Sequence, residues 1–154
     1  MLAAELAPDS WNNHFKFGRY CAILTRFQKF DSHSGLQMAA IGATSTDDLP
    51  FFRKFYLGGY GTFFGYDRRE FVATDLWYMD LGYRYLFFRS SMAGWLMYNV
   101  GQFADDGFEL SDSEVKHAIG IGFSIEDEIR LNIARRLDNS DASFKFSVSL
   151  DLHF

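Results

Sequence analysis

Side chains that commonly carry chemistry are few and scattered in this sequence of 154 residues. The four histidines, at positions 14, 33, 117 and 153, are far apart, and Cys21 is the single cysteine. No His-x-x-x-His or Cys-x-x-Cys pair offers metal ligands, and no Gly-x-Ser-x-Gly sequence offers a hydrolase nucleophile. The glycines between 58 and 65 lack the spacing of phosphate-binding and dinucleotide-binding loops. The sequence therefore predicts no enzyme activity, no metal site and no cofactor.

One acidic stretch between residues 105 and 114 has the oxygen ligands that a cation would need. It contains Asp105, Asp106, Glu109, Asp112 and Glu114. A solvated loop is the commoner explanation of such a run, and we favour it.

Composition narrows the class of protein. The net charge is −5 and no basic stripe is present, so nucleic-acid binding is not expected. An aromatic content of 19% with only two prolines favours β-strands over helices. No apolar run reaches the length of a transmembrane helix, and residues 1–11 lack the features of a secretory signal. An exported protein with this sequence would need its signal to lie upstream.

Strict alternation of side chains marks the last twelve residues, 143–154, as a strand. Its length slightly exceeds the roughly 9–11 residues with which a tilted strand crosses a bilayer. The apolar face consists of Phe144, Phe146, Val148, Leu150, Leu152 and Phe154. Similar alternation predicts strands at 77–88, 115–126 and 128–137, and weaker patterns predict strands at 14–30, 34–45 and 90–103.

The connections between these strands also follow a pattern. Short polar turns are expected at 31–34, near 89, at 127 and at 138–141, and longer connections at 46–76 and 104–114. Tight turns on one side and larger loops on the other are typical of transmembrane barrels. We therefore predict an all-β fold, an antiparallel transmembrane β-barrel with meander topology, in a single domain covering 1–154.

Seven predicted strands cannot easily close a barrel, because single-chain bacterial barrels have an even number of at least eight. We consider three solutions. The chain forms the carboxyl-terminal half of a larger barrel whose other strands lie upstream, which we favour. Alternatively, a second copy completes the barrel, or residues 1–13 and part of 46–76 supply an eighth strand.

Segment 49–76 carries the most distinctive motifs. It contains Leu49-Pro50, Phe55-Tyr56-Leu57-Gly58-Gly59, Gly65-Tyr66 and Asp67-Arg68-Arg69-Glu70-Phe71, and Leu81-Gly82-Tyr83-Arg84-Tyr85 follows it. In this order, the motifs resemble those of the bacterial surface antigen family. That family contains the barrels of outer-membrane assembly factors, two-partner secretion translocators and patatin-linked outer-membrane proteins. The resemblance covers roughly residues 36–154 and is greatest to the patatin-linked branch, because Phe64 stands where the other members usually have the arginine that anchors a loop in the lumen.

The resemblance implies a location and a function. It implies a protein of the bacterial outer membrane that serves membrane-protein assembly, protein translocation or anchoring of a passenger domain. Its partners would be the lipid bilayer and, during insertion, the barrel-assembly machinery. Any lipase activity would lie in an upstream domain.

The resemblance also implies two sites. The first is a loop folded into the lumen, for which an ordinary extracellular loop is the alternative. Its motif consists of Leu57, Gly58, Gly59, Gly65, Tyr66, Asp67 and Arg68. The second is an assembly signal at the end of the last strand, for which an apolar face capped by Phe154 is the alternative. This signal consists of Val148, Leu150, Leu152 and Phe154.

Four charged residues on the polar faces of predicted strands are candidates for a charge network in the lumen. They are Asp80, Arg84, Arg130 and Arg136, and separately solvated charges are the equally weighted alternative. The second class of function is a soluble, lipocalin-like barrel that holds a small apolar ligand in an aromatic interior. A membrane barrel would direct apolar side chains outward and charges inward, whereas a carrier would do the reverse.

Overall fold

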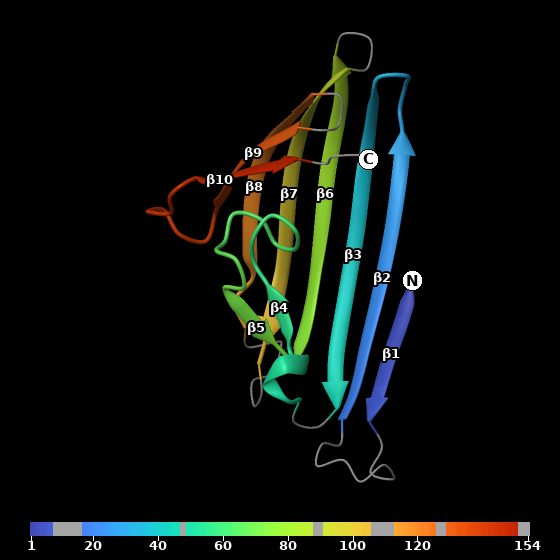
Figure 1. The fold of residues 1–154 in the computed structure, drawn as a ribbon, viewed down its shortest axis with the longest axis vertical. Helices are drawn as coiled ribbons and strands as arrows, with labels where there is room; N and C mark the ends of the chain where they lie inside the picture. Colours follow the sequence, from blue (N-terminus) through green and yellow to red (C-terminus); the bar gives the residue numbers. More distant parts are fainter. Residues whose placement is uncertain (8–16, 47–48, 88–90, 106–112, 126–128, 151–154) are drawn as a thin grey trace.

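The computed structural model describes residues 1–7, 17–46, 49–87, 91–105, 113–125 and 129–150. Within these residues, eight strands form one antiparallel sheet in which each strand pairs with its neighbours in the chain (Figure 1). The strands are β1 (Leu2–Ala7), β2 (Phe17–Lys29), β3 (Ser34–Thr46), β6 (Asp75–Phe87), β7 (Met92–Ala104), β8 (Lys116–Ile125), β9 (Ile129–Arg136) and β10 (Lys145–Leu150). The predicted all-β antiparallel meander is confirmed. The sheet is not closed, since β1 and β10 form its two edges.

The seven predicted strands correspond to β2, β3 and β6 to β10, and β1 is an eighth strand that the alternation did not identify. This strand pairs with β2 from Leu2 opposite Ala22 to Ala7 opposite Phe17. The sheet therefore has eight strands where the alternation predicted seven, and the eighth lies within residues 1–13, from which one of the three solutions drew part of an eighth strand. The described part of β10 ends at Leu150, so Leu152 and Phe154 of the predicted assembly signal lie outside the described residues.

Successive connections of an antiparallel meander lie at alternate ends of the sheet. The short connections 30–33, 88–91 and 126–128 therefore share one end, which we call the turn end. The connections 47–74, 105–115 and 137–144 share the other, which we call the loop end. The predicted short turn at 138–141 thus lies among the larger loops.

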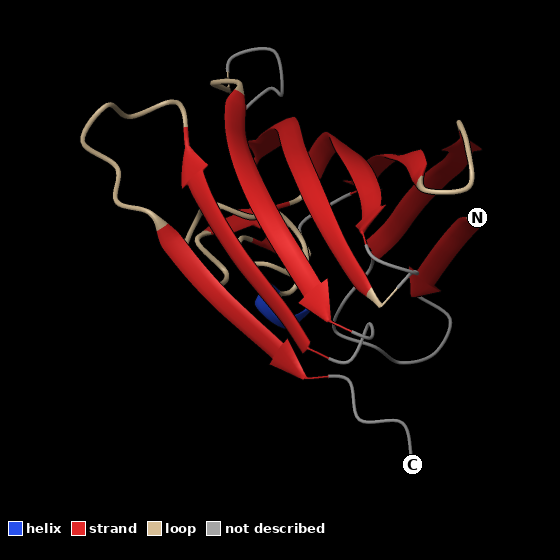
Figure 2. Cartoon of the chain, turned by 90° about the horizontal axis from the view of Figure 1, so that it is seen from above, coloured by secondary structure: helices blue, strands red, loops and turns tan. Residues whose placement is uncertain are grey.

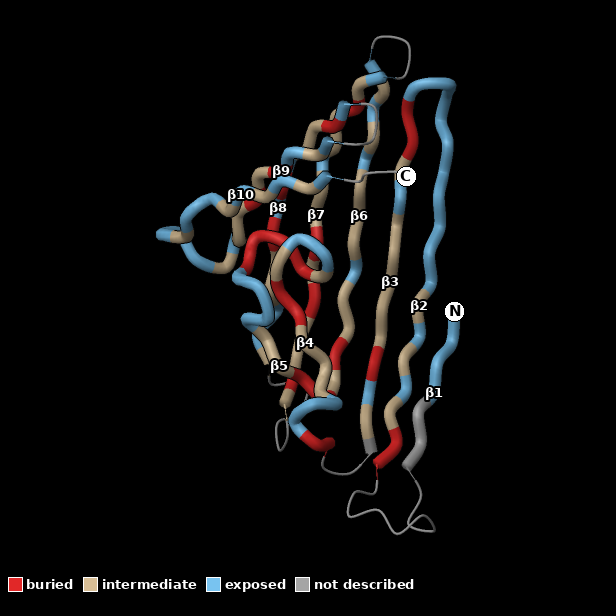
Figure 3. Tube along the Cα trace, viewed as in Figure 1, coloured by how far each residue is buried: buried red, intermediate tan, exposed pale blue. Residues whose placement is uncertain are grey.

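The two faces of the sheet differ because successive side chains of a strand point to opposite sides. The inner face is the one against which residues 49–74 pack, and it includes the buried residues Ala43, Leu76, Ala118 and Ala134. Figure 2 shows that the sheet curves around this segment. The outer face is exposed and apolar, as the exposed fractions of 52% for Leu96, 57% for Ile121 and 67% for Val148 illustrate. Figure 3 shows the burial concentrated where the segment meets the sheet.

The turn between β2 and β3 is organised by one carboxylate. Asp31 accepts hydrogen bonds from the backbone N–H of His33 at 2.6 Å and of Ser34 at 2.8 Å, and from the Ser34 hydroxyl at 2.8 Å. The His33 N–H and the Ser34 groups favour the charged carboxylate and hold the pKa of Asp31 below its ordinary value. The ionised side chain therefore stabilises this turn.

We expect Asp31→Ala to lower the urea midpoint of unfolding at pH 7, and the difference from the parent protein to vanish near pH 2. A carboxyl group with a depressed folded-state pKa contributes stability above its unfolded value of about 3.9, and that stability is lost as the pH falls through the folded pKa. Ser32→Ala in the same turn is the control, because the Ser32 hydroxyl contacts His33 and not Asp31. An Asp31→Ala effect that is equally large at both pH values would contradict this role.

Candidate functional site

Residues 49–74, which we call the inner segment, form a second layer on the inner face. After Pro50, the chain makes one 3₁₀ turn, Phe51–Arg53, and then a hairpin of β4 (Phe55–Leu57) and β5 (Phe71–Ala73). The hairpin pairs Phe55 with Ala73 and Leu57 with Phe71. Residues 58–70 form its long tip, which lies over the sheet (Figure 1).

Glycines permit the sharp bends of this tip. Gly58, Gly59 and Gly65 have φ values of 111°, 90° and 85°, in a region that other residues rarely adopt. Gly58 also donates its N–H to Thr62 at 3.0 Å and accepts from Arg69 at 3.3 Å. The contact with Arg69 joins the two ends of the tip.

Phe63 is the centre of the packing between the inner segment and the sheet, and it is fully buried. Its ring centroid lies 5.2 Å from that of Tyr66 and 6.3 Å from that of Phe71, both in the inner segment. On the sheet side, it lies 6.0 Å from Tyr78 of β6 and 4.9 Å from Phe103 of β7, both nearly perpendicular to it. Edge-to-face aromatic pairs of this kind each contribute about 0.5–1.5 kcal/mol beyond their buried area.

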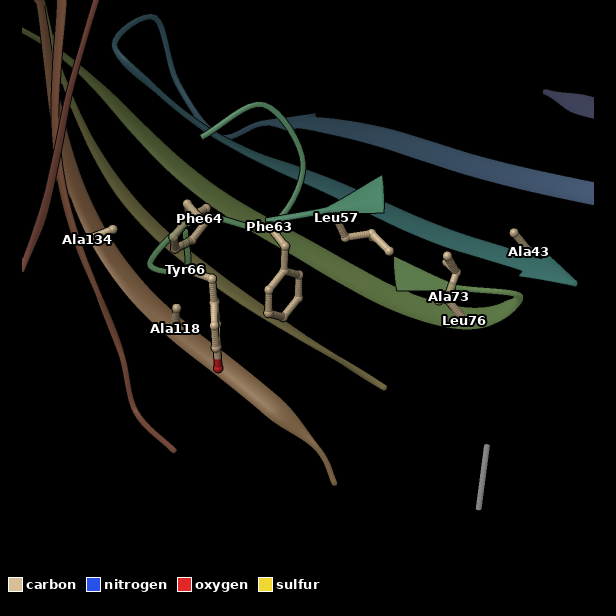
Figure 4. Close-up of a cluster of buried hydrophobic side chains, with 9 residues drawn as sticks. All are labelled: Ala43, Leu57, Phe63, Phe64, Tyr66, Ala73, Leu76, Ala118 and Ala134. Atoms are coloured by element: carbon tan, nitrogen blue, oxygen red, sulfur yellow. The ribbon is translucent and has the colours of Figure 1, made fainter. Parts of the chain in front are cut away.

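Small residues of the sheet make room for this cluster. Ala118 of β8 and Ala134 of β9 lie under Phe64 and Tyr66 (Figure 4). A Cβ atom added to Gly65 would lie 2.6 Å from the Cβ of Ala118, so the backbone of the inner segment approaches the sheet very closely here. Glycine and alanine at this contact therefore set the depth at which the segment is docked.

Ion pairs join the tip to β9 and β10. Asp67 accepts from Lys145 at 2.6 Å, and Glu70 accepts from Arg136 at 2.8 Å. The Arg136 guanidinium also lies 4.8 Å from the centre of the Tyr66 ring. The inner segment thus provides the carboxylates and the sheet provides the cations.

Asp138 extends this cluster at the loop end. It accepts from Arg136 at 3.0 Å and pairs with Lys116 at 3.2 Å. Burial alone would raise the pKa of Asp138, but the hydrogen bonds from Arg136 and Lys116 outweigh burial and lower it. Burial, and then the charge of Asp138, raises the pKa of Tyr66 above its ordinary range, so its hydroxyl stays neutral and donates to the His117 carbonyl at 3.2 Å.

The residues of the predicted loop motif share this segment but have different roles. Leu57, Gly65 and Tyr66 are buried at the contact with the sheet, Gly58 and Gly59 bend the tip, and Asp67 pairs with Lys145. Arg68 is exposed and lines a cavity of about 220 Å³ between the tip and β10. Phe64 is 8% exposed and packs with Ala118 and Ala134. An apolar contact therefore occupies the position at which the resemblance would place an anchoring arginine.

The four candidates for a charge network divide into two groups. Asp80 and Arg130 line one cavity of about 260 Å³ on the inner face, together with Trp95, and Arg84 lies 4.8 Å from the centre of the Trp95 ring. Arg136 belongs instead to the separate cluster with Glu70 and Asp138.

Two buried asparagines accompany the first group on the inner face. Asn99, opposite Asp80, is fully buried, and Asn132 is 5% exposed. Among the described residues, neither polar atom of Asn99 has a hydrogen-bond partner, nor do Asp80 Oδ1 and Asn132 Nδ2. Buried polar groups in this state are unusual in a packed core. The alternation in 90–103 was too weak to identify Asn99 from the sequence.

A larger, apolar cavity of about 440 Å³ lies between the inner segment and β1 to β3. It is lined by Cys21, Ile23 and Ile41 from the sheet and by Phe55 and Leu57 from the inner segment. On the inner face, charged side chains therefore line the cavity of Asp80 and Arg130, and mostly apolar side chains line the cavity beside β1 to β3.

The described residues contain no group of three or more His, Cys, Asp or Glu side chains arranged to hold a metal ion. They also contain no helix long and apolar enough to cross a membrane.

No protein-family model and no curated protein matches the sequence, so the resemblance to the surface antigen family stays a prediction. The candidate site is therefore described by its geometry alone, which is that of a segment docked on the inner face of an open sheet.

We expect Gly65→Ala to destabilise this docking by about 1–3 kcal/mol, because it forces a side chain into a left-handed backbone conformation and against Ala118. Trypsin should then cleave faster at Arg68 and Arg69, and the urea midpoint should fall. Gly61→Ala is the matched control, because a Cβ atom there meets nothing within 4 Å. Equal protease resistance of the two variants would argue against close docking at Gly65.

Proposed function

We propose that this chain forms part of the wall of a bacterial outer-membrane β-barrel, with the inner segment in the lumen. In this proposal, the barrel serves membrane-protein assembly, protein translocation or anchoring of a passenger domain. The observation that carries the proposal is the apolar outer face of the sheet.

Most residues of β6 to β10 that point outward are apolar. On β8 they include Ile119, Ile121 and Ile125, which are 43%, 57% and 42% exposed. On the neighbouring strands the outer face continues with Met79, Leu96, Ile129, Leu131, Phe146, Val148 and Leu150. Soluble monomers rarely expose a contiguous apolar surface larger than a few hundred Å². In a bilayer, by contrast, the lipid-facing band of a β-barrel has this composition.

Aromatic side chains lie towards both ends of the outer face. Near the loop end, Trp77 donates to the side chain of Gln102 at 2.9 Å. Near the turn end, Tyr83 lies beside Phe30, and the rings of Tyr85 and Phe87 are 4.9 Å apart. Aromatic residues near the ends of lipid-facing strands are typical of membrane barrels, where such rings lie at the interfaces.

The charged residues on the inner face of β6 to β10 support the same orientation of the sheet, with its outer face toward lipid. Asp80, Arg84 and Arg130 lie on it, as do Lys145 and Arg136, which bind the inner segment. An aqueous lumen accommodates such charges, whereas the interior of a carrier for apolar ligands would not. A soluble, lipocalin-like barrel remains the second candidate, and the observation in its favour is the apolar cavity of about 440 Å³, whose volume suits a small ligand.

Cysteine labelling in a Cys21→Ser background tests the proposal on β10. Val148 points outward and Ser149 inward, and within the described residues neither side chain has a hydrogen bond or ion pair that a cysteine would break. In liposomes, we expect Val148→Cys to react only with a lipid-soluble thiol reagent and Ser149→Cys only with a water-soluble one. The two positions are adjacent, so each serves as the control for the other.

The opposite labelling result would contradict the membrane proposal. If the protein stays soluble without detergent and Val148→Cys reacts readily with the water-soluble reagent, the membrane proposal is wrong. The lipocalin-like alternative then predicts that a small apolar fluorophore binds the cavity beside Ile23 and Ile41.

A further inference from the structure

The cavity of about 220 Å³ between the tip and β10 is lined by polar side chains that the proposed membrane function does not use. Most of them can donate hydrogen bonds, namely Tyr60 and Arg68 from the tip and Asn132, Lys145 and Ser147 from the sheet. Among the described residues that line the cavity, Asp67 is the one carboxylate. A cavity in which donors predominate suits a ligand whose atoms accept hydrogen bonds.

The charges around this cavity do not cancel. Lys145 donates to Asp67 at 2.6 Å, so this pair is neutral as a whole. Arg68 has no hydrogen bond, ion pair or ring contact within the described residues, so its positive charge is not balanced there. The nearby Arg136, by contrast, pairs with two carboxylates. The surplus of positive charge at Arg68 favours an anionic ligand.

Two neutral donors beside these charges also lack partners. Ser147 of β10 and Asn132 of β9 lie directly opposite each other. Within the described residues, Nδ2 of Asn132 has no hydrogen-bond partner although the residue is only 5% exposed, and the Ser147 hydroxyl makes no hydrogen bond. A buried N–H group without an acceptor is costly, so a ligand oxygen within its reach would offset that cost.

The arrangement of the donors favours phosphate over carboxylate. A carboxylate has two oxygens in one plane, whereas a phosphate monoester has three terminal oxygens and a charge of about −1.5 to −2 at pH 7. Three oxygens can meet donors that come from the tip, from β9 and from β10. Tyr60 and Phe64 also line the cavity of Asp80 and Arg130, so the two cavities adjoin and leave room for the group that carries the phosphate.

We propose that the cavity between the tip and β10 binds the phosphate group of a small phosphate monoester. Arg68 and Lys145 supply the positive charge, and Ser147 and Asn132 donate to the remaining oxygens. Because such a ligand contacts both the tip and the sheet, its binding stabilises the docked tip. The cavity lies between the inner segment and the sheet whether or not the outer face contacts lipid, so the site does not depend on the proposed membrane function.

Isothermal titration calorimetry with inorganic phosphate tests the site, at about 0.1 M ionic strength, where charges more than about 10 Å apart are largely screened. We expect saturable binding of one phosphate per refolded chain. Arg68→Gln keeps most of the side chain but removes its charge, and it should weaken binding about tenfold or more. Arg69→Gln is the matched control, because Arg69 lies beside the Tyr56 ring and does not line the cavity. It should change the dissociation constant less than about twofold.

Asp67→Asn should have the opposite effect on phosphate binding. It removes the carboxylate beside the ligand and frees Lys145, so phosphate should bind more tightly. If the Asp67–Lys145 pair served only to hold the tip, the same variant would bind phosphate more weakly. Weaker binding by Asp67→Asn would therefore overturn the proposed role of Lys145.

Urea unfolding separates loss of the site from loss of the fold. Arg68→Gln should match the parent protein without phosphate, and phosphate should raise the midpoint of the parent but not of the variant. No saturable binding by the parent, or equal weakening by Arg68→Gln and Arg69→Gln, would overturn the site. Acetate that competes as strongly as phosphate would overturn the choice of phosphate. None of these results alters the labelling expected at Val148→Cys, so the proposed function is tested separately.

Discussion

The docking of Phe63 on the inner face is the interaction on which the remaining architecture depends. It holds a second layer of backbone against the sheet, and Ala118 and Ala134 are small where that layer comes closest. Because the layer occupies the inner side, the apolar residues of the outer face have no protein cover in the described chain.

The polar contacts of the inner segment fix its orientation, but they do not by themselves hold it on the sheet. Exposed pairs such as Lys145 with Asp67 contribute little, because solvent screens both charges. The Arg136 cluster is more shielded, and it combines two carboxylates with the ring of Tyr66. The aromatic contacts around Phe63 therefore contribute most of the stabilisation between the inner segment and the sheet. The ion pairs fix the position of the tip over β9 and β10.

The sequence was most informative where alternation was strict. β8, β9 and β10 could be predicted because isoleucine, leucine, valine and phenylalanine occupy every second position. β1 was missed because its alanines at positions 3, 4 and 7 give neither face a distinct character. The ion pairs of the inner segment could not be predicted, since Glu70 and Arg136 are 66 residues apart in the chain. Arg136 was grouped with Arg130 because both lie on the same face of β9, but they are six positions apart in the strand and belong to different clusters.

We propose that the outer face of the sheet contacts lipid while the inner face does not. The most direct test compares Trp77, on the outer face, with Trp95, on the inner face beside Arg84. Single-tryptophan variants, with the other tryptophans replaced by phenylalanine, would be refolded into liposomes that contain brominated phospholipids. We predict strong quenching of Trp77 fluorescence and little quenching of Trp95 fluorescence. Equal quenching of both, or quenching of Trp95 alone, would contradict the proposed orientation.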